Sequence, residues 1–209
     1  MPRYARSERL ALADLFLAVG PDAPTLNEGW TTRDLAAHLI VRERRPDAGA
    51  GIVLPPLAGY AERVRRRIAA RDWAALVGQV RRPPLWSPLS NPLVDEAANL
   101  MEFFIHHEDV RRAVPDWQPR ELPAGLTAGL WRRVGPVARL ALRRFPARVL
   151  IEAPGHGEVG SGRGGEQLRV VGDPGELLLF LSGRQPAARV HLDGPPAVAE
   201  RLRTAALGF

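Results

Sequence analysis

The sequence predicts an α+β protein in which a mainly helical part, residues 1–145, precedes a small α/β domain, residues 146–209. In the first part the apolar residues recur with the spacing of amphipathic helices, and beyond Pro146 the pattern becomes strand-like. A chain of 209 residues can bury a substantial core, as one large or two small domains. We therefore expect a helical bundle followed by a smaller mixed unit.

The first two helices carry clear boundary signals. Residues 7–19 predict a helix with Ser7 as a candidate cap and a glycine just past its end. A second helix is expected over about 32–45, because Thr31 and Asp34 have the spacing of a capping box. Both segments are typical of bundle helices.

The next helices precede a long proline-rich connection. Residues 57–70 predict a third helix, with Tyr60 facing inward and Arg65 solvated. Asp72 is expected to cap a short continuation. Residues 81–92 contain too many prolines for a helix or a central strand, so they form a crossover.

The stretch 91–113 predicts the most informative helix of the chain. Asn91 suits the N-cap and Pro92 the first helical position. At about 100° of rotation per residue, one narrow stripe of this helix is polar although its flanks are apolar. The stripe consists of Asp95, Asn99, Glu102, His106 and Asp109.

A buried polar stripe is costly unless its groups find partners, and a metal ion suits a carboxylate and an imidazole together. Glu102 and His106 are one turn apart, so both can reach one ion, whereas His107 points about 100° further round the helix. An isolated pair with this spacing is also typical of an exposed ion pair. His38 points at least partly inward from the second helix, and a lone inward histidine is more often a hydrogen-bonded core residue than a ligand.

The C-terminal part alternates helix and strand signals. Residues 126–141 keep helical spacing, although Gly135-Pro136 should kink or split that helix. Residues 148–153 and 166–171 predict a hairpin whose long tip is glycine-rich. The tip lacks the Gly-Lys-Ser/Thr of a phosphate loop. The remaining segments predict a helix, a strand and a closing helix over 173–183, 188–194 and 195–209.

Composition excludes several function classes. The chain has no Cys, so it has no disulfide, cysteine nucleophile or thiolate ligand. All 29 basic residues are Arg, which suggests a GC-rich genome, and they are scattered among acids without aromatic stacking partners. The net charge of +6 is therefore not read as a nucleic-acid footprint. No signal-peptide core or membrane span is visible, which predicts a soluble cytoplasmic protein.

The segments Trp30–Leu39 and Glu102–Arg111 together resemble the DinB-like metal-binding bundle family. They are most similar to its actinobacterial branch, which includes mycothiol-dependent maleylpyruvate isomerase. The resemblance implies an up-down four-helix bundle and a C-terminal α/β domain similar to sterol carrier proteins. It also implies a divalent ion, usually zinc, held by His38, Glu102 and His106. Asp109 and Asn99 are expected to lie next to these ligands, where they would orient an imidazole or the ligand in the open position.

The resemblance implies an enzyme that uses a small thiol such as mycothiol for isomerisation or thiol transfer on a small electrophile. Carboxylates of the substrate could then be clamped by nearby arginines. Two alternatives remain: a metal-binding protein without catalysis, and a metallohydrolase with Asp109 or Asp95 as general base. No catalytic residue beyond the metal ligands can be assigned, and either a monomer or a homodimer fits. We expect neither a nucleic-acid nor a membrane partner.

Overall fold

The computed structural model describes residues 3–49, 51, 54–84, 86–87, 89, 91 and 94–208. Its packing divides the chain into two compact units, Met1–Pro119 and Arg120–Phe209. The boundary between these units falls earlier in the chain than the predicted one at residue 145, because the helix that precedes residue 145 packs within the second unit. Among the described residues, no helix is both long enough and apolar enough to cross a membrane.

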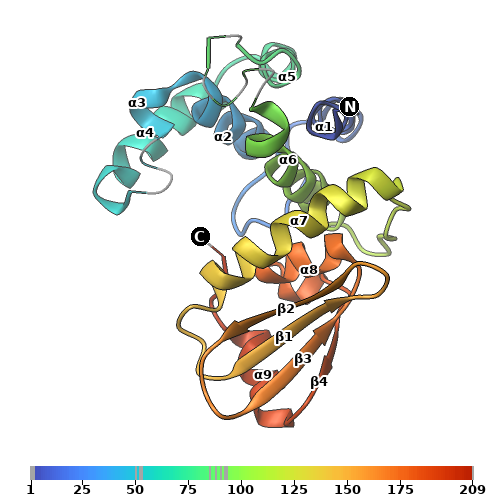
Figure 1. The fold of residues 1–209 in the computed structure, drawn as a ribbon. Coiled ribbons are helices and arrows are strands. Elements are labelled where there is room, and N and C mark those ends of the chain that lie inside the picture. Colours follow the sequence, from blue (N-terminus) through green and yellow to red (C-terminus); the bar gives the residue numbers. More distant parts are fainter. Residues whose placement is uncertain are drawn as a thin grey trace. The chain divides into compact units, whose positions relative to one another are not determined.

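The first unit is helical (Figure 1). Its helices are α1 (Tyr4–Val19), α2 (Thr32–Arg44), α3 (Pro46–Gly49), α4 (Ala58–Ala69), α5 (Trp73–Arg81) and α6 (Asp95–Arg111), with a 3₁₀ turn at Pro55–Leu57. Helix α1 packs against α5 and α6, and α2 packs against α4 and α5. Their apolar faces form one core that includes Phe16, Leu35, Ile68 and Phe103. The longer helices thus meet along their apolar stripes, as an amphipathic pattern requires.

Two predicted caps are confirmed. The Thr31 backbone N–H donates to Asp34 Oδ2 at 3.0 Å, and the Thr31 side chain completes the capping box of α2. Asp72 accepts a hydrogen bond from the Ala75 N–H and caps α5. The predicted cap Ser7 is wrong, because α1 already begins at Tyr4.

Two predicted orientations on α4 are wrong. Tyr60 is exposed, and its hydroxyl donates to Asp47 at 2.6 Å. Arg65 is buried and pairs with Asp34 and Glu62. Periodicity alone assigned the apolar side chain to the core and the charged one to water, but two half-buried carboxylates and an aromatic ring can hold an arginine inside.

Helix α6 begins later than expected. The Asn91 carbonyl accepts hydrogen bonds from the N–H groups of Val94 and Asp95, so a turn precedes the helix and Asn91 is not its cap. Pro92 lies outside the described residues. The helix nevertheless keeps its polar stripe, with Asn99 and Asp109 fully buried.

The second unit joins a small sheet to helices (Figure 1). In chain order it contains α7 (Ala124–Ala141), β1 (Arg148–Ala153), β2 (Gly157–Gly162), β3 (Gln167–Val171), α8 (Pro174–Leu181), a 3₁₀ turn (Gln185–Ala187), β4 (His191–Asp193) and α9 (Pro196–Thr204). The strand order is β2-β1-β3-β4, with β1 and β3 parallel and the outer strands antiparallel to their neighbours. Helix α7 packs on α8 and β2 and runs unsplit through Pro136.

The predicted hairpin between 148–153 and 166–171 is wrong. The glycine-rich segment is itself strand β2, which pairs with β1, whereas β3 lies parallel to β1 on the other side. Gly155 and Gly157 have φ of 78° and 120°, a region that glycine enters without strain, and they allow the tight turn between β1 and β2. The glycine-rich segment therefore contains an edge strand, not the loop at the end of a hairpin.

Candidate metal centre

Three side chains from two helices converge in the first unit. His38 comes from α2, and Glu102 and His106 come from α6. One potential ligand atom of each lies within 4.8 Å of the others. Glu102 Oε1 is 3.4 Å from His38 Nε2 and 3.3 Å from His106 Nε2. The three residues that the sequence grouped therefore lie together.

The chemistry of this cluster fits a divalent ion. The two imidazole rings stand edge to face, with centroids 5.3 Å apart, and both present Nε2 to the same carboxylate oxygen. Two imidazole nitrogens and one carboxylate oxygen are a donor set that zinc accepts, and they leave its fourth position for a small ligand. Within the part of the chain that the structure describes, this is the group of three possible ligands whose atoms lie close enough to share an ion.

Asp109 orients His106. Its Oδ2 lies 2.9 Å from His106 Nδ1 and accepts a second hydrogen bond from Asn27 Nδ2 at 3.1 Å. The Asp109 carboxylate is fully buried, so this contact is sheltered from water. A carboxylate on Nδ1 fixes the ring so that Nε2 faces Glu102 and is available to a metal.

Asn99 reaches the cluster through an arginine that the sequence analysis missed. Arg42 NH1 donates to Asn99 Oδ1 at 2.5 Å, while Arg42 Nε lies 3.4 Å from Glu102 Oε1. Asn99 therefore positions Arg42, which in turn positions Glu102. The sequence contained a signal for Arg42, because this residue follows His38 by one helical turn and lies on the same face of the helix.

The charges of the cluster are unevenly distributed. Burial opposes ionisation of Glu102, yet hydrogen bonds from His106 and His38 hold its pKa well below the usual value. Burial lowers the pKa of His38, and the nearby Glu102 only partly offsets this. Burial also disfavours charged His106, but Asp109 and Glu102 outweigh it and raise its pKa to about 9. Without a metal, proton binding is thus favoured at His106, which lies between two carboxylates, and disfavoured at His38.

The other histidines are not members of this cluster. His107 Nδ1 is 3.0 Å from Glu8 Oε2 of α1, so this ring joins two helices. His156 follows β1 in a turn, and His191 begins β4. Both belong to the second unit.

A cavity of about 300 Å³ borders His38. Trp30 lies against the imidazole, with ring centroids 5.3 Å apart, and the Arg65 guanidinium lies 4.7 Å from the Trp30 ring centre. Val41, Ala58, Ala61 and Glu62 complete most of the lining. The sequence analysis missed this cavity because it placed Arg65 in solvent.

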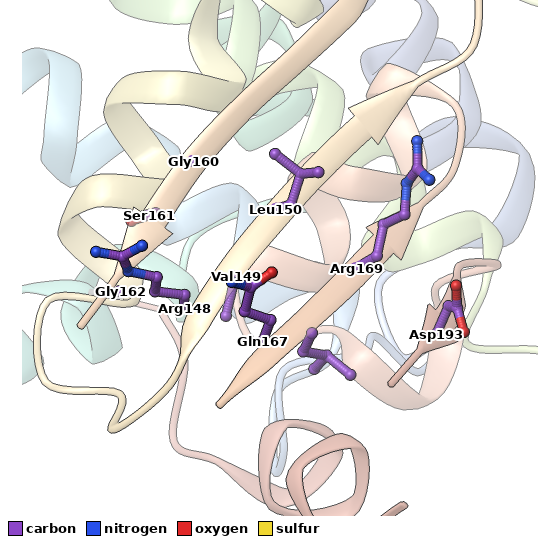
Figure 2. Close-up of a pocket in the computed structure, with 10 residues that line it drawn as sticks. Arg148, Val149, Leu150, Gly160, Ser161, Gly162, Gln167, Arg169 and Asp193 are labelled. Carbon is purple, nitrogen blue, oxygen red and sulfur yellow. The ribbon is translucent and has the colours of Figure 1, made fainter. Parts of the chain in front are cut away.

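A larger hollow of about 640 Å³ lies on the exposed face of the sheet in the second unit (Figure 2). Arg148, Leu150 and Arg169 stand on this face, with Asp193 at one side. Arg169 pairs with Glu152 of the neighbouring strand. None of the predicted ligands lines this hollow.

Two solved structures resemble the chain. They are mycothiol-dependent maleylpyruvate isomerase and a histidine-to-alanine mutant of it. Each matches with a TM-score of 0.59 and 16% identity over 92% of this chain and 93% of the other. The chain therefore has a fold related to that of this isomerase. No family model matches the chain, and neither does any curated protein sequence.

Proposed function

We propose that the protein is an enzyme that depends on a divalent metal, most suitably zinc, and uses a low-molecular-weight thiol such as mycothiol. It would catalyse isomerisation of a small electrophile or thiol transfer to it. The observation that carries the proposal is the convergence of His38, Glu102 and His106, with a cavity beside His38. The related fold of a mycothiol-dependent isomerase supports it.

Each residue of the cluster has a distinct part in this proposal. His38, Glu102 and His106 would hold the ion, with Asp109 fixing the His106 ring and Arg42 fixing the Glu102 carboxylate. A bound divalent ion supplies one chemical property, the lowering of the pKa of a coordinated thiol. The protein has no Cys, so the sulfur must come from a separate molecule.

The metallohydrolase alternative has less support from the geometry. Its candidate bases were Asp109 and Asp95, and each carboxylate is bound to other protein groups. Asp109 Oδ2 contacts His106 and Asn27. Asp95 Oδ1 accepts from Asn99 and lies 3.6 Å from an Arg9 nitrogen. Neither is therefore well placed to take a proton from a water molecule at the ion.

The assignment to a DinB-like family and the likeness of the second unit to sterol carrier proteins stay predictions. They bear on ancestry, whereas the proposed chemistry rests on the cluster and the cavity. Metal binding without catalysis is the remaining alternative, and it shares the same ligands.

Turnover with and without thiol tests the proposal. The zinc-loaded protein is offered cis-enone acids and simple electrophiles, first alone and then with mycothiol. We expect product only when both zinc and thiol are present, and none from His106→Ala. The matched control is His107→Ala, whose altered ring lies outside the cluster. Hydrolysis without thiol would favour the metallohydrolase, and no turnover under any condition would favour metal binding alone.

A further inference from the structure

The cavity beside His38 carries information about the substrate. Its lining is mostly apolar and includes Trp30, Val41 and two alanines of α4. Its charged members, Glu62 and Arg65, form an ion pair with each other. The lining charges therefore cancel before any ligand enters.

The Arg65 guanidinium is already committed to protein carboxylates. Its Nε and NH2 donate to the two oxygens of Glu62, each at 2.7 Å, and NH1 donates to Asp34. This is the bidentate geometry in which arginine binds a carboxylate most strongly, and one face of the group also covers Trp30. A substrate carboxylate would have to displace Glu62 to be bound in the same way.

Glu62 is fully charged at neutral pH. Hydrogen bonding to Arg65 lowers the pKa of Glu62 to about 2, despite partial burial. Arg66 adds a third hydrogen bond to the same carboxylate from the solvent side. The Glu62 carboxylate is thus ionised and held by two guanidinium groups, so Arg65 is not released to an anionic ligand.

Arg42, the other arginine near the cluster, is committed as well. Its three nitrogens face Glu102, Asn99 and the Ala98 carbonyl. The expectation of arginines that clamp substrate carboxylates is therefore not met by either Arg42 or Arg65.

We infer that the electrophile of this site is an uncharged, largely apolar molecule of about the size of a substituted ring, not a dicarboxylate. The inference rests on the proposed function, whose substrate class it narrows. An apolar cavity of about 150 Å³ holds benzene, so 300 Å³ accommodates a ring with substituents. The Trp30 ring and Val41 supply its apolar contacts.

Binding of two unreactive probes tests the inference without turnover. Nitrobenzene and maleate are titrated calorimetrically into the full-length chain, both zinc-loaded and zinc-free, since the zinc-free form removes carboxylate binding to the ion. In the zinc-free chain we expect nitrobenzene to bind at least about tenfold more tightly than maleate. Tighter binding of maleate there would overturn the inference.

Two variants locate the binding. Ala58→Trp adds bulk at an exposed lining position, where the fold tolerates it, and should weaken nitrobenzene binding at least about tenfold. Glu62→Gln frees the Arg65 fork and should strengthen maleate binding about tenfold, the size of one charge-assisted hydrogen bond. Glu158→Gln on β2 is the matched control and should change neither probe.

Failure of the inference and failure of the proposed function remain distinguishable. Nitrobenzene binding that is unaffected by Ala58→Trp would overturn the assignment of the cavity, whatever the enzyme does with thiols. The expected probe selectivity without any thiol-dependent turnover would uphold the cavity assignment and refute the proposed reaction.

Discussion

The adjacent histidines of α6 show how the two sides of one helix differ. His106 and His107 are both nearly buried, at 8% and 7% exposure, and each has a carboxylate about 3 Å from Nδ1. His107 meets Glu8 where α1 packs on α6. His106 meets Asp109, and its Nε2 also faces Glu102 within reach of a second imidazole.

This difference separates a structural pair from a candidate metal site. One imidazole and one carboxylate satisfy each other and tie two helices together. On the Nε2 side of His106, a second imidazole and a second carboxylate bring together more possible metal-ligand atoms than a simple hydrogen-bonded pair contains. The convergence of several possible metal-ligand atoms, not the burial of a histidine, therefore makes the His106 side the candidate site for an ion.

Removing the two rings in turn gives the largest expected effect. His106→Ala should reduce bound zinc from one ion per chain to nearly none, because an inner ligand is lost. His107→Ala should keep the ion, although it leaves Glu8 buried without its imidazole. Elemental analysis of the purified proteins measures both. Equal loss of zinc in the two variants would remove the contrast between the two sides.

Removing the carboxylates behind the rings should have a smaller effect. Asp109→Ala should weaken zinc affinity about 10- to 100-fold, because the His106 ring loses the partner that orients it. Glu8→Ala should leave zinc affinity unchanged, since Glu8 acts on His107. Competition with a chromophoric chelator measures the two affinities. A drop of the same size in Glu8→Ala would contradict the separation.

The pH dependence should also distinguish the His106 side. Asp109 and Glu102 raise the pKa of His106 to about 9 from the ordinary 6.5, so zinc must displace a proton below pH 9. We expect zinc affinity to rise up to about tenfold per pH unit as pH increases towards 9, and then to level off. Calorimetry in buffers of different ionisation enthalpy would report the released proton. A flat profile would contradict the raised pKa.

The same pKa predicts how the zinc-free fold responds to pH. Because the folded-state value is raised, the protonated ring stabilises the fold below about pH 6.5, and this stability is lost as pH rises through 9. Denaturant unfolding of the zinc-free protein should show the decline, whereas the zinc-loaded protein should not.

The smallest expected effect concerns the structural pair. Glu8→Gln should lower the free energy of unfolding by about 1–3 kcal/mol, because a buried charge-assisted hydrogen bond becomes a neutral one. Zinc content should not change. Urea titration and elemental analysis on the same preparation measure both quantities, and a loss of zinc would show that the two sides of α6 are coupled.

Local sequence signals predicted much of the first unit. The capping box at Thr31 and Asp34 and the cap at Asp72 are confirmed because each involves groups only three residues apart. The grouping of Glu102 and His106 rests on the same kind of spacing. The addition of His38 depended on a family resemblance, since helix periodicity does not show which helices face each other.

The second unit was harder to predict because strand pairing is not local. Residues 148–153 and 166–171 were expected to form a hairpin, but the strands found there, β1 and β3, pair in parallel, with β2 on the far side of β1. Glycine is depleted in strands, so β2 resembled a loop. Its position depends on pairing with β1 and on packing against α7.

The sequence by itself determined the absence of cysteine, the helical period of the first unit and the polar stripe of α6. These properties follow from composition and from contacts within one or two helical turns. Only the tertiary structure decided that Arg65 is held inside by Asp34 and Glu62, and that Arg42 links Asn99 to Glu102. Three of these four contacts join residues 31 to 60 positions apart. The fourth, between Arg65 and Glu62, involves a buried charge, which is favourable only once every partner is in place.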